Sequence, residues 1–396
     1  MRVLIVTKIF PNQVEPLSSP FNRKQFAALG RFCDVEVLAT IPWFPGAAAV
    51  RRWAGGARLS AVPERETIDG LRVRHPRFMF LPRIGHAVSG PLYAASLAKT
   101  ALEYRGRVDI VLGSWAYPDG YAAVVLADLL GVPAVIKLHG SDMNVVARMP
   151  GPRKRLEWAL PRAERVVAVS RPLAEAALNL GVAKHRIDVI PNGIDRDAFQ
   201  PRDRDEARRE LGLPIDERIV LYVGNVLETK GTLDLVRAFG EAGPRLPRTR
   251  LVVLGGGKDL EACTLLAKEL GIDAQFLGPK PHAEIPRWIT ACDLLALPSW
   301  NEGMPNVVLE ALASGRRVVA THVGGIPDIV TSEQLGLLVS PKNPVELAAA
   351  LERVLATEGD PAVISQSLPI GDWEHSARAL YQSLLSALEA RATDAA

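Results

Sequence analysis

The chain has 396 residues, a formal net charge of +3 and 48% hydrophobic residues. This hydrophobic content excludes a mainly disordered protein. The cysteines, Cys33, Cys263 and Cys292, are odd in number and far apart, which excludes a disulfide scaffold and fits a reducing compartment. At roughly 100–200 residues per domain, the length predicts two or three domains. No run of about 18 apolar residues occurs, so we expect no transmembrane helix and a cytoplasmic protein.

The small net charge hides an asymmetry between the two halves. Residues 1–195 contain 26 Lys and Arg against 16 Asp and Glu, a net charge of +10, and residues 196–396 carry −7. A membrane surface or a phosphate-bearing acceptor would suit the basic half, and ordinary variation between domains is the alternative. The basic residues 148–155 fit membrane contact or a solvated loop. No nucleic-acid-binding module is recognisable, so we expect no nucleic-acid partner.

The first half alternates short apolar runs with amphipathic stretches, which predicts a doubly wound parallel sheet. The opening run, Val3–Val6, is read as a strand and not as a signal peptide. The other expected strands are Val35–Ala39, Ile110–Leu112, Ala134–Leu138, Val166–Val169 and Asp188–Ile190. The expected helices include Asn22–Arg31, Gly120–Leu130 and Ala174–Leu180. Pro42–Arg83, which holds Trp43, Phe44 and Trp53, interrupts this rhythm as a surface insertion with a hairpin near Asp69-Gly70.

The alternation restarts after Asp195–Glu217, a charged linker with a short helix. The expected strands are Ile219–Val223, Arg250–Leu254, Ala274–Leu277, Leu294–Leu297, Arg317–Ala320 and Leu337–Val339. The expected helices are Leu233–Ala242, Leu260–Leu270, Ile285–Ala291 and Asn306–Ala313. A final helix spans Trp373–Ala390. The predicted domains are therefore 1–195 and 196–372, and ligands of such sheets bind beyond the carboxyl ends of the strands.

The strongest chemical signal is Pro298-Ser-Trp-Asn-Glu-Gly-Met-Pro-Asn-Val-Val-Leu-Glu310. A strand ends before it, and a helix begins near Pro305, a residue tolerated at the first helical position. The N–H groups that open this helix would form a phosphate site. Glu302 can reach that anion's surroundings, and Glu310 can accept hydrogen bonds from a ribose diol. Two solvated glutamates beside a buried helix are the alternative.

The second signal is Val223-Gly-Asn-Val-Leu-Glu-Thr-Lys-Gly231. Lys230 lies at a strand-to-helix turn, where a point charge suits phosphate, or it is a surface lysine. The order of residues differs from that of the nucleotide-binding P-loop. The glycines at 255–257 lack the dinucleotide fingerprint and give little support for a nicotinamide or flavin cofactor.

Two further segments follow strands of the first half. His139, at the end of Ala134–Leu138, is a candidate hydrogen-bond donor or proton relay, with a structural histidine as the alternative. Ser141 or Asp142 would cap the next helix. Trp115 and Tyr117 follow Ile110–Leu112 and would stack on a sugar or pack in the core. No His/Cys cluster or Asp-x-Asp pair with metal-ligand spacing is present, so we expect no metal.

The order of these motifs resembles the GT4-type family of retaining glycosyltransferases. The shared motifs are His-Gly-Ser-Asp at 139–142, Pro-Asn-Gly-Ile-Asp at 191–195, Gly-x5-Lys-Gly at 224–231, Glu-Gly-x-Pro-x4-Glu at 302–310 and Gly-Gly-Ile-Pro-Asp at 324–328. The resemblance runs from about residue 1 to 385. It implies an α/β GT-B fold, in which two Rossmann-like doubly wound domains face each other across a deep cleft. It also implies that the segment 373–396 returns to the N-terminal, acceptor-binding domain.

The resemblance implies a role for individual residues. Glu310 would bind the ribose of a nucleotide-sugar donor, and Glu302 would hold the donor sugar together with the backbone of Gly303, Met304, Pro305 and Asn306. Lys230 and the N–H of Val307 would neutralise the leaving diphosphate, and His139 would lie near the transferred sugar. No nucleophile stands out, so front-face attack is the preferred route to retention. The nucleotide sugar is a co-substrate, and no cofactor is implied.

The sequence departs from the family pattern in two places. Asn225 stands in the donor loop where relatives commonly carry Arg, so one positive charge on the diphosphate is missing or comes from elsewhere. Pro16–Asn22 replaces a glycine-rich loop, and Ser18, Ser19 and Asn22 are its candidate acceptor-side residues, together with Trp115 and Tyr117.

The acceptor is inferred from members that build bacterial cell-surface polysaccharide. It would be a glycan, or a glycan linked to lipid diphosphate at the inner face of the plasma membrane, with peripheral contact between protein and anionic lipid. Transfer to a small soluble acceptor, a nucleotide-sugar 2-epimerase and an inactive binding protein are the alternatives.

Overall fold

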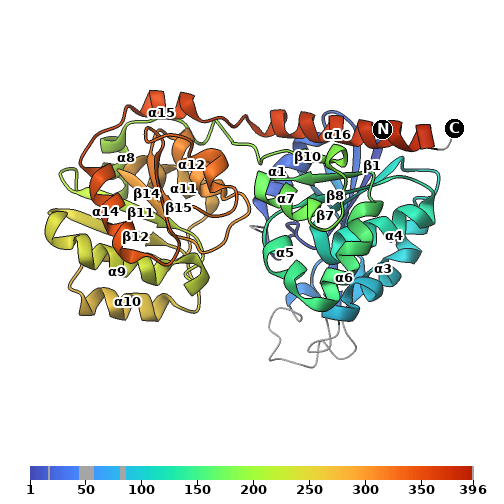
Figure 1. The fold of residues 1–396 in the computed structure, drawn as a ribbon, viewed down its shortest axis with the longest axis horizontal. Coiled ribbons are helices and arrows are strands. Elements are labelled where there is room, and N and C mark those ends of the chain that lie inside the picture. The colour runs from blue at the N-terminus through green and yellow to red at the C-terminus, as the bar shows by residue number, and fades with distance from the viewer. Residues whose placement is uncertain (17, 44–57, 81–85, 395–396) are drawn as a thin grey trace. The chain divides into compact units, whose positions relative to one another are not determined.

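The computed structural model describes residues 1–16, 18–43, 58–80 and 86–394, which belong to two compact units (Figure 1). The N-terminal unit comprises Met1–Gly193 with Trp373–Ala396, and the C-terminal unit comprises Ile194–Asp372. The division falls two residues before the expected one. Among the described residues, no helix is both long enough and apolar enough to span a membrane.

The N-terminal unit is built on an eight-stranded sheet with the order β10-β9-β8-β7-β1-β2-β5-β4. All neighbouring strands are parallel except β4 and β5. Its strands are β1 (Arg2–Thr7), β2 (Asp34–Ala39), β4 (Arg65–Ile68), β5 (Leu71–Arg74), β7 (Ile110–Ser114), β8 (Ala134–Leu138), β9 (Arg165–Ala168) and β10 (Ile187–Val189). The central strands β7 and β8 are buried throughout, as a parallel sheet covered on both faces requires.

Helices cover the two faces of this sheet. The C-terminal helix α16 (Trp373–Asp394) packs against α1 (Pro20–Leu29), and both contribute to the core beneath them. Gln25 Nε2 of α1 donates to Ser376 Oγ of α16 over 2.9 Å. The helices α3 (His86–Leu102), α4 (Tyr121–Leu130) and α6 (Pro150–Ala159) pack on one another, and α5 (Ser141–Asn144) and α7 (Arg171–Leu178) complete the unit.

The basic segment 148–155 is not a loop, because α6 begins at Pro150 and buries Pro152, Leu156 and Ala159. Its first turn is rich in proline and arginine, which masks the helical pattern, although proline is tolerated at a helix start.

The described residues of the insertion form four short strands. The hairpin is confirmed, since β4 and β5 are antiparallel and Asp69 and Gly70 have φ angles of 49° and 81°. In addition, β5 joins the main sheet beside β2, and β3 (Ile41–Trp43) pairs with β6 (Arg77–Met79), neither of which was predicted from the sequence. Phe44 and Trp53 lie outside the described residues.

The C-terminal unit has a wholly parallel sheet with the order β13-β12-β11-β14-β15-β16. Its strands are β11 (Arg218–Val223), β12 (Thr249–Leu254), β13 (Ala274–Phe276), β14 (Leu294–Leu297), β15 (Arg317–Thr321) and β16 (Gly336–Val339). Numbered within the unit, the order is 3-2-1-4-5-6, that of the Rossmann fold. The order reverses between β11 and β14, so their carboxyl ends form the edge at which such sheets bind ligands.

The helices of the C-terminal unit form two groups. In one group α9 (Thr232–Ala242) packs against α10 (Leu260–Glu269) and α14 (Pro344–Leu355). In the other, α11 (Ile285–Ala291) packs against α8 (Arg204–Leu211) and α12 (Asn306–Ala313), and α12 packs against α15 (Pro361–Ser367) and α13 (Ile326–Ile329). Figure 1 shows the groups on opposite sides of β11, β12, β14 and β15. The bounds of α11 and α12 are those predicted.

Candidate active site

The two loops singled out in the C-terminal sequence meet at the reversal point of the sheet. One follows β11 and the other follows β14, and Lys230 Nζ lies 2.7 Å from Glu302 Oε1. The Lys230 side chain is 30% exposed and that of Glu302 is 11% exposed. A backbone hydrogen bond of 2.9 Å from the N–H of Trp300 to the carbonyl of Thr229 also joins the loops. The pair is therefore a fixed, partly desolvated charge pair at the ligand-binding edge.

Two glycines allow this close approach of loop to loop. Gly231, with φ of +67°, faces the carbonyl of Pro298, and Gly324, with φ of +53°, faces the carbonyl of Glu302. A Cβ atom at either position would collide with the backbone, and the positive φ also disfavours an L side chain. Both positions therefore require glycine if the Glu302 loop is to keep its position.

The helix that carries Glu310 begins directly after this loop. Gly303, Met304 and Pro305 are buried, and α12 starts at Asn306, with Asn306 and Val307 half-buried. The first turn of α12 contains no acidic residue, so its positive amino end is not neutralised there.

Glu310 has a partner that the sequence analysis missed. Its Oε1 atom lies 3.4 Å from His282 Nε2, and His282 comes from a turn just before α11. Phe199 meets the same imidazole edge-on, with ring centroids 6.0 Å apart. Nothing in the sequence near Glu310 signals these distant contacts.

Trp300 is held by two further residues that the sequence analysis missed. Its Nε1 atom donates to Asp234 Oδ2 of α9 over 2.8 Å, and Lys342 Nζ lies 4.2 Å from the centroid of a Trp300 ring. These contacts come from segments 66 and 42 residues away, so no local pattern could reveal them. These contacts fix the position of Trp300, two residues before Glu302.

Asn225, the residue that departs from the family pattern, is exposed just after β11. Its backbone carbonyl accepts a hydrogen bond of 2.7 Å from the Tyr222 hydroxyl. The loop is thus anchored through its backbone, and position 225 offers an exposed side chain at the ligand-binding edge.

In the N-terminal unit, His139 follows β8, and its Nε2 atom lies 2.9 Å from Ser114 Oγ at the end of β7. Ser114 Oγ also lies 3.2 Å from Asn22 Oδ1, while Asn22 Nδ2 donates to the carbonyl of Ile9. Because the Asn22 oxygen can only accept, the Ser114 hydroxyl donates to it and accepts from His139 Nε2–H. This hydrogen-bond chain assigns the Nε2–H tautomer and leaves Nδ1 unprotonated.

Aromatic rings and a buried carboxylate also surround His139. Its ring centroid lies 5.9 Å from that of Trp115 and 5.2 Å from that of Phe21. The Asp142 carboxylate accepts hydrogen bonds from the backbone N–H groups of His139, Gly140, Met143 and Ala116. Burial lowers the pKa of His139, and the neighbouring Lys137 lowers it further. His139 is therefore neutral at pH 7.

The predicted acceptor-side residues have different surroundings. Asn22 and Trp115 belong to the His139 cluster. Ser18 and Ser19 lie just before α1, where the Ser18 N–H donates to the carbonyl of Glu15 and Ser19 has φ of 46°. Tyr117 must be corrected, because it is 1% exposed and its hydroxyl accepts from the N–H of Gly90 over 2.7 Å. It is a core residue whose ring cannot stack on a sugar.

Among the residues that the structure describes, no group of three or more His, Cys, Asp or Glu side chains could hold a metal ion.

Comparison with known proteins places these features in a family. Residues 28–198 match the model of Glycosyltransferase Family 4, and residues 203–367 match that of Glycosyl transferases group 1. The chain is 32% identical over 359 residues to a protein of Bacillus subtilis named putative teichuronic acid biosynthesis glycosyltransferase TuaC, covering 89% of each chain. It is also 32% identical over 357 residues to a D-inositol 3-phosphate glycosyltransferase of Nocardioides, covering 81% of this chain and 78% of the relative.

Solved structures share the fold at lower identity. HepE of Anabaena, in complex with UDP, superposes with a TM-score of 0.73 at 20% identity, over 98% of this chain and 100% of HepE. Sucrose-phosphate synthase of Thermosynechococcus elongatus gives 0.75 at 22% identity, with the same coverage. Since the family models and a full-length relative agree with two Rossmann-like units, the chain belongs to the GT4-type glycosyltransferases and has the GT-B fold.

Proposed function

We propose that this chain is a retaining glycosyltransferase that moves a sugar from a nucleotide diphosphate sugar to a glycan, or a lipid-linked glycan, during cell-surface polysaccharide synthesis. The observation that carries the proposal is the Lys230–Glu302 pair at the reversal point of the C-terminal sheet. The relatives' names support the chemistry: HepE was solved with UDP and with UDP-glucose, and TuaC is named for teichuronic acid synthesis.

The donor's diphosphate would lie between Lys230 and the amino end of α12. Negative charge grows on the diphosphate as the glycosidic bond breaks, and a preorganised ammonium and helix amides stabilise that charge. Glu302 and Glu310 would accept hydrogen bonds from the sugar and ribose hydroxyls. Under this proposal the chain's own groups neutralise the leaving group, which is the task that a metal ion performs in other transferases.

A neutral His139 suits a reaction in which the sugar becomes oxocarbenium-like. An imidazolium would oppose the positive charge that develops on the anomeric carbon, whereas the unprotonated Nδ1 can accept a hydrogen bond from a hydroxyl. We propose that His139 orients the transferred sugar and that the acceptor attacks from the face that the diphosphate leaves.

Transfer to a small soluble acceptor is the second candidate. Several relatives are named D-inositol 3-phosphate glycosyltransferases, and a phosphorylated acceptor would also suit a basic N-terminal domain. Sedimentation with anionic vesicles, reversed by salt, would favour the lipid-linked acceptor and peripheral membrane contact.

The test is the release of nucleoside diphosphate from UDP-, GDP- and ADP-sugars, with and without a membrane lipid extract or soluble sugar phosphates. We expect one of these donors to release its nucleoside diphosphate only when an acceptor is present. Lys230→Met and Glu302→Gln should each abolish this release. Turnover of the donor without an acceptor would favour a 2-epimerase instead. If no nucleotide sugar binds, the proposal is wrong.

A further inference from the structure

The exposed side of α6 in the N-terminal unit carries positive charge. Its apolar side faces the core, whereas Lys154 and Arg155 are exposed to solvent. Residues 145–163 contain five Lys and Arg against one Glu, a net charge of +4. The helix therefore combines a buried apolar face with an exposed basic face, and a basic face of this kind attracts anionic surfaces.

Two cations and two aromatic rings form a continuous stack beside this face. The Arg155 guanidinium lies 5.9 Å from the centroid of the Tyr121 ring, and the Tyr121 and Trp158 rings are 5.3 Å apart. The Arg162 guanidinium lies 4.7 Å from the centroid of the Trp158 ring and donates to the Trp158 carbonyl over 2.9 Å. Both distances from cation to ring are those of cation–π contacts. Lys154 precedes Trp158 by four residues, which places it on the same side of the helix.

We call these five residues the basic–aromatic surface. Its cations are not neutralised by carboxylates. Among the described residues, Lys154, Arg155 and Arg162 form no ion pair. The one glutamate of the segment, Glu157, is already paired with Arg153, whose Nε lies 2.9 Å from Glu157 Oε1. The positive charge of this surface is therefore available to an external anion.

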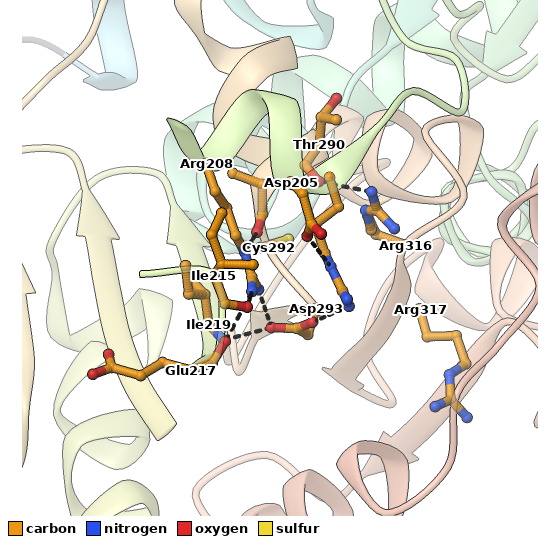
Figure 2. Close-up of polar contacts among 12 residues, drawn as sticks. Asp205, Arg208, Ile215, Glu217, Ile219, Thr290, Cys292, Asp293, Arg316 and Arg317 are labelled. Carbon is orange, nitrogen blue, oxygen red and sulfur yellow. Dashed lines mark hydrogen bonds and ion pairs between the residues drawn. The ribbon is translucent and has the colours of Figure 1, made fainter. Parts of the chain in front are cut away.

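The arginines of α8 in the C-terminal unit show the opposite arrangement. Arg208 Nη2 lies 2.6 Å from Asp293 Oδ2, in the cluster shown in Figure 2, and Arg204 Nη1 lies 2.6 Å from Asp293 Oδ1. These cations are balanced inside the protein. The comparison shows that a group of arginines in this chain is not by itself an anion-binding surface, and that the missing carboxylates set α6 apart.

The basic–aromatic surface adjoins elements that carry the predicted acceptor-side residues. Tyr121 begins α4, and α6 packs against the turn Ala116–Gly120, which connects Trp115 to α4. Along the chain, α5 begins two residues after His139 and precedes α6. A partner bound to this surface would therefore lie on the same unit as the His139 cluster and close to the segment that follows Trp115.

We propose that the basic–aromatic surface binds an anionic phospholipid bilayer. Its cations would face the lipid phosphates, and the Tyr121 and Trp158 rings would lie at the level of the headgroups, where such rings are enriched. A single-stranded nucleic acid fits less well, because a stacked base needs a free ring face, and each ring here is flanked by an arginine and by the other ring.

The role of this contact, which is to hold the N-terminal unit where a lipid-linked acceptor lies, rests on the proposed function. The binding itself is measured without donor or acceptor. The test is flotation of the full-length protein with vesicles of phosphatidylcholine alone, or of phosphatidylcholine mixed with phosphatidylglycerol. We expect binding to the mixed vesicles only, and salt should weaken it.

The variants follow from the charges. One cation near an anionic membrane surface strengthens binding about fivefold. Lys154→Gln/Arg155→Gln should therefore bind the mixed vesicles about 25-fold more weakly than the wild-type protein, and Arg162→Gln about fivefold more weakly. Urea unfolding of each variant checks the fold, and Arg162→Gln keeps the test valid if the double variant does not fold.

Arg105→Gln/Arg107→Gln is the matched control, because it removes the same charge from the same unit. Both arginines are exposed in the turn before β7, at the opposite edge of the sheet from His139. This control should bind the mixed vesicles nearly as the wild-type protein does. If it weakens binding as much as the α6 variants do, the binding depends on net charge and the inference is overturned.

Two other results would also overturn it: no binding of the wild-type protein to the mixed vesicles, or tighter binding to a single-stranded oligonucleotide than to the vesicles. The proposed function fails in a different assay. Vesicle binding that persists while no nucleotide sugar binds would uphold the basic–aromatic surface and overturn only the proposed function.

Discussion

Replacing Lys230 by methionine removes the ammonium group that lies 2.7 Å from Glu302 Oε1, and it keeps most of the side-chain length. If Lys230 stabilises the leaving diphosphate, its loss removes a preorganised interaction that strengthens in the transition state. Removal of one such donor in other active sites lowers kcat by on the order of 10²–10³, which corresponds to about 2.7–4 kcal/mol. We expect kcat for Lys230→Met to fall by that factor.

The same change should affect stability far less. Lys230 is 30% exposed, so solvent screens the pair, while Glu302 is 11% exposed and loses its counter-ion. Exposed pairs contribute about 0.2–1 kcal/mol, and breaking a fully buried pair costs about 3–5 kcal/mol. For this pair we expect a loss of about 1 kcal/mol, or about 2–4 °C in Tm for a unit of this size.

The assay is nucleoside-diphosphate release under saturating donor, beside urea unfolding of the same preparations. Lys268→Met is the control, because Lys268 lies exposed on α10 in the same unit and should behave as wild type. Since Lys230 and Glu302 act as a pair, the double variant Lys230→Met/Glu302→Gln should lose less kcat than the product of the two single-variant factors. A kcat for Lys230→Met equal to that of the control, or a loss of activity that only parallels unfolding, would refute the reasoning.

Three other changes test the surroundings of the site. Asp142→Ala leaves four backbone N–H groups around His139 without their acceptor, so we expect a loss of more than about 3 kcal/mol in urea unfolding, at about 1–3 kcal/mol for each unsatisfied group. Burial lowers the pKa of Lys137 to about 7, against its usual value near 10.4. Between these two pH values the unfolded state binds more protons than the folded state, so the free energy of unfolding should rise by about 1.4 kcal/mol per pH unit. Lys137→Met should lack this rise when denaturation is measured as a function of pH. Asn225→Arg adds, at an exposed position, the positive charge that the family resemblance leads us to expect there. The donor KM should therefore fall by up to about fivefold, and an unchanged KM would show that the charge comes from elsewhere.

The sequence predicted that Lys230 and Glu302 follow the carboxyl ends of two strands, because that depends only on local patterns. A buried run followed by Gly and Lys, or by Glu-Gly-x-Pro, marks the end of a strand and the start of a helix. Lys230 and Glu302 could therefore be placed at one edge before any coordinates were known, since the carboxyl ends of neighbouring parallel strands lie together.

The partners of these residues could not be predicted in the same way. His282 reaches Glu310, and Trp300 is held by Asp234 and Lys342, through contacts between segments that no local pattern connects. Tyr117 shows the converse error, in which an aromatic residue after a strand points into the core. The start of α6 was missed because its proline-rich and arginine-rich first turn has no helical periodicity.

The charge of the two units leads to a last prediction about salt. The N-terminal unit has 28 Lys and Arg against 18 Asp and Glu, and the C-terminal unit has 19 against 26. An anionic donor must therefore bind the C-terminal unit against its net charge, through short-range contacts such as that with Lys230, which salt screens weakly. An anionic acceptor would instead be attracted at low ionic strength by charges spread over the whole basic unit. Salt screens that attraction once the Debye length, about 8 Å at physiological salt, becomes shorter than the distances involved. Raising the salt concentration should increase the KM for a phosphate-bearing acceptor much more than the KM for the donor. Equal sensitivity of both KM values would mean that the basic charge of the N-terminal unit has no part in binding the acceptor.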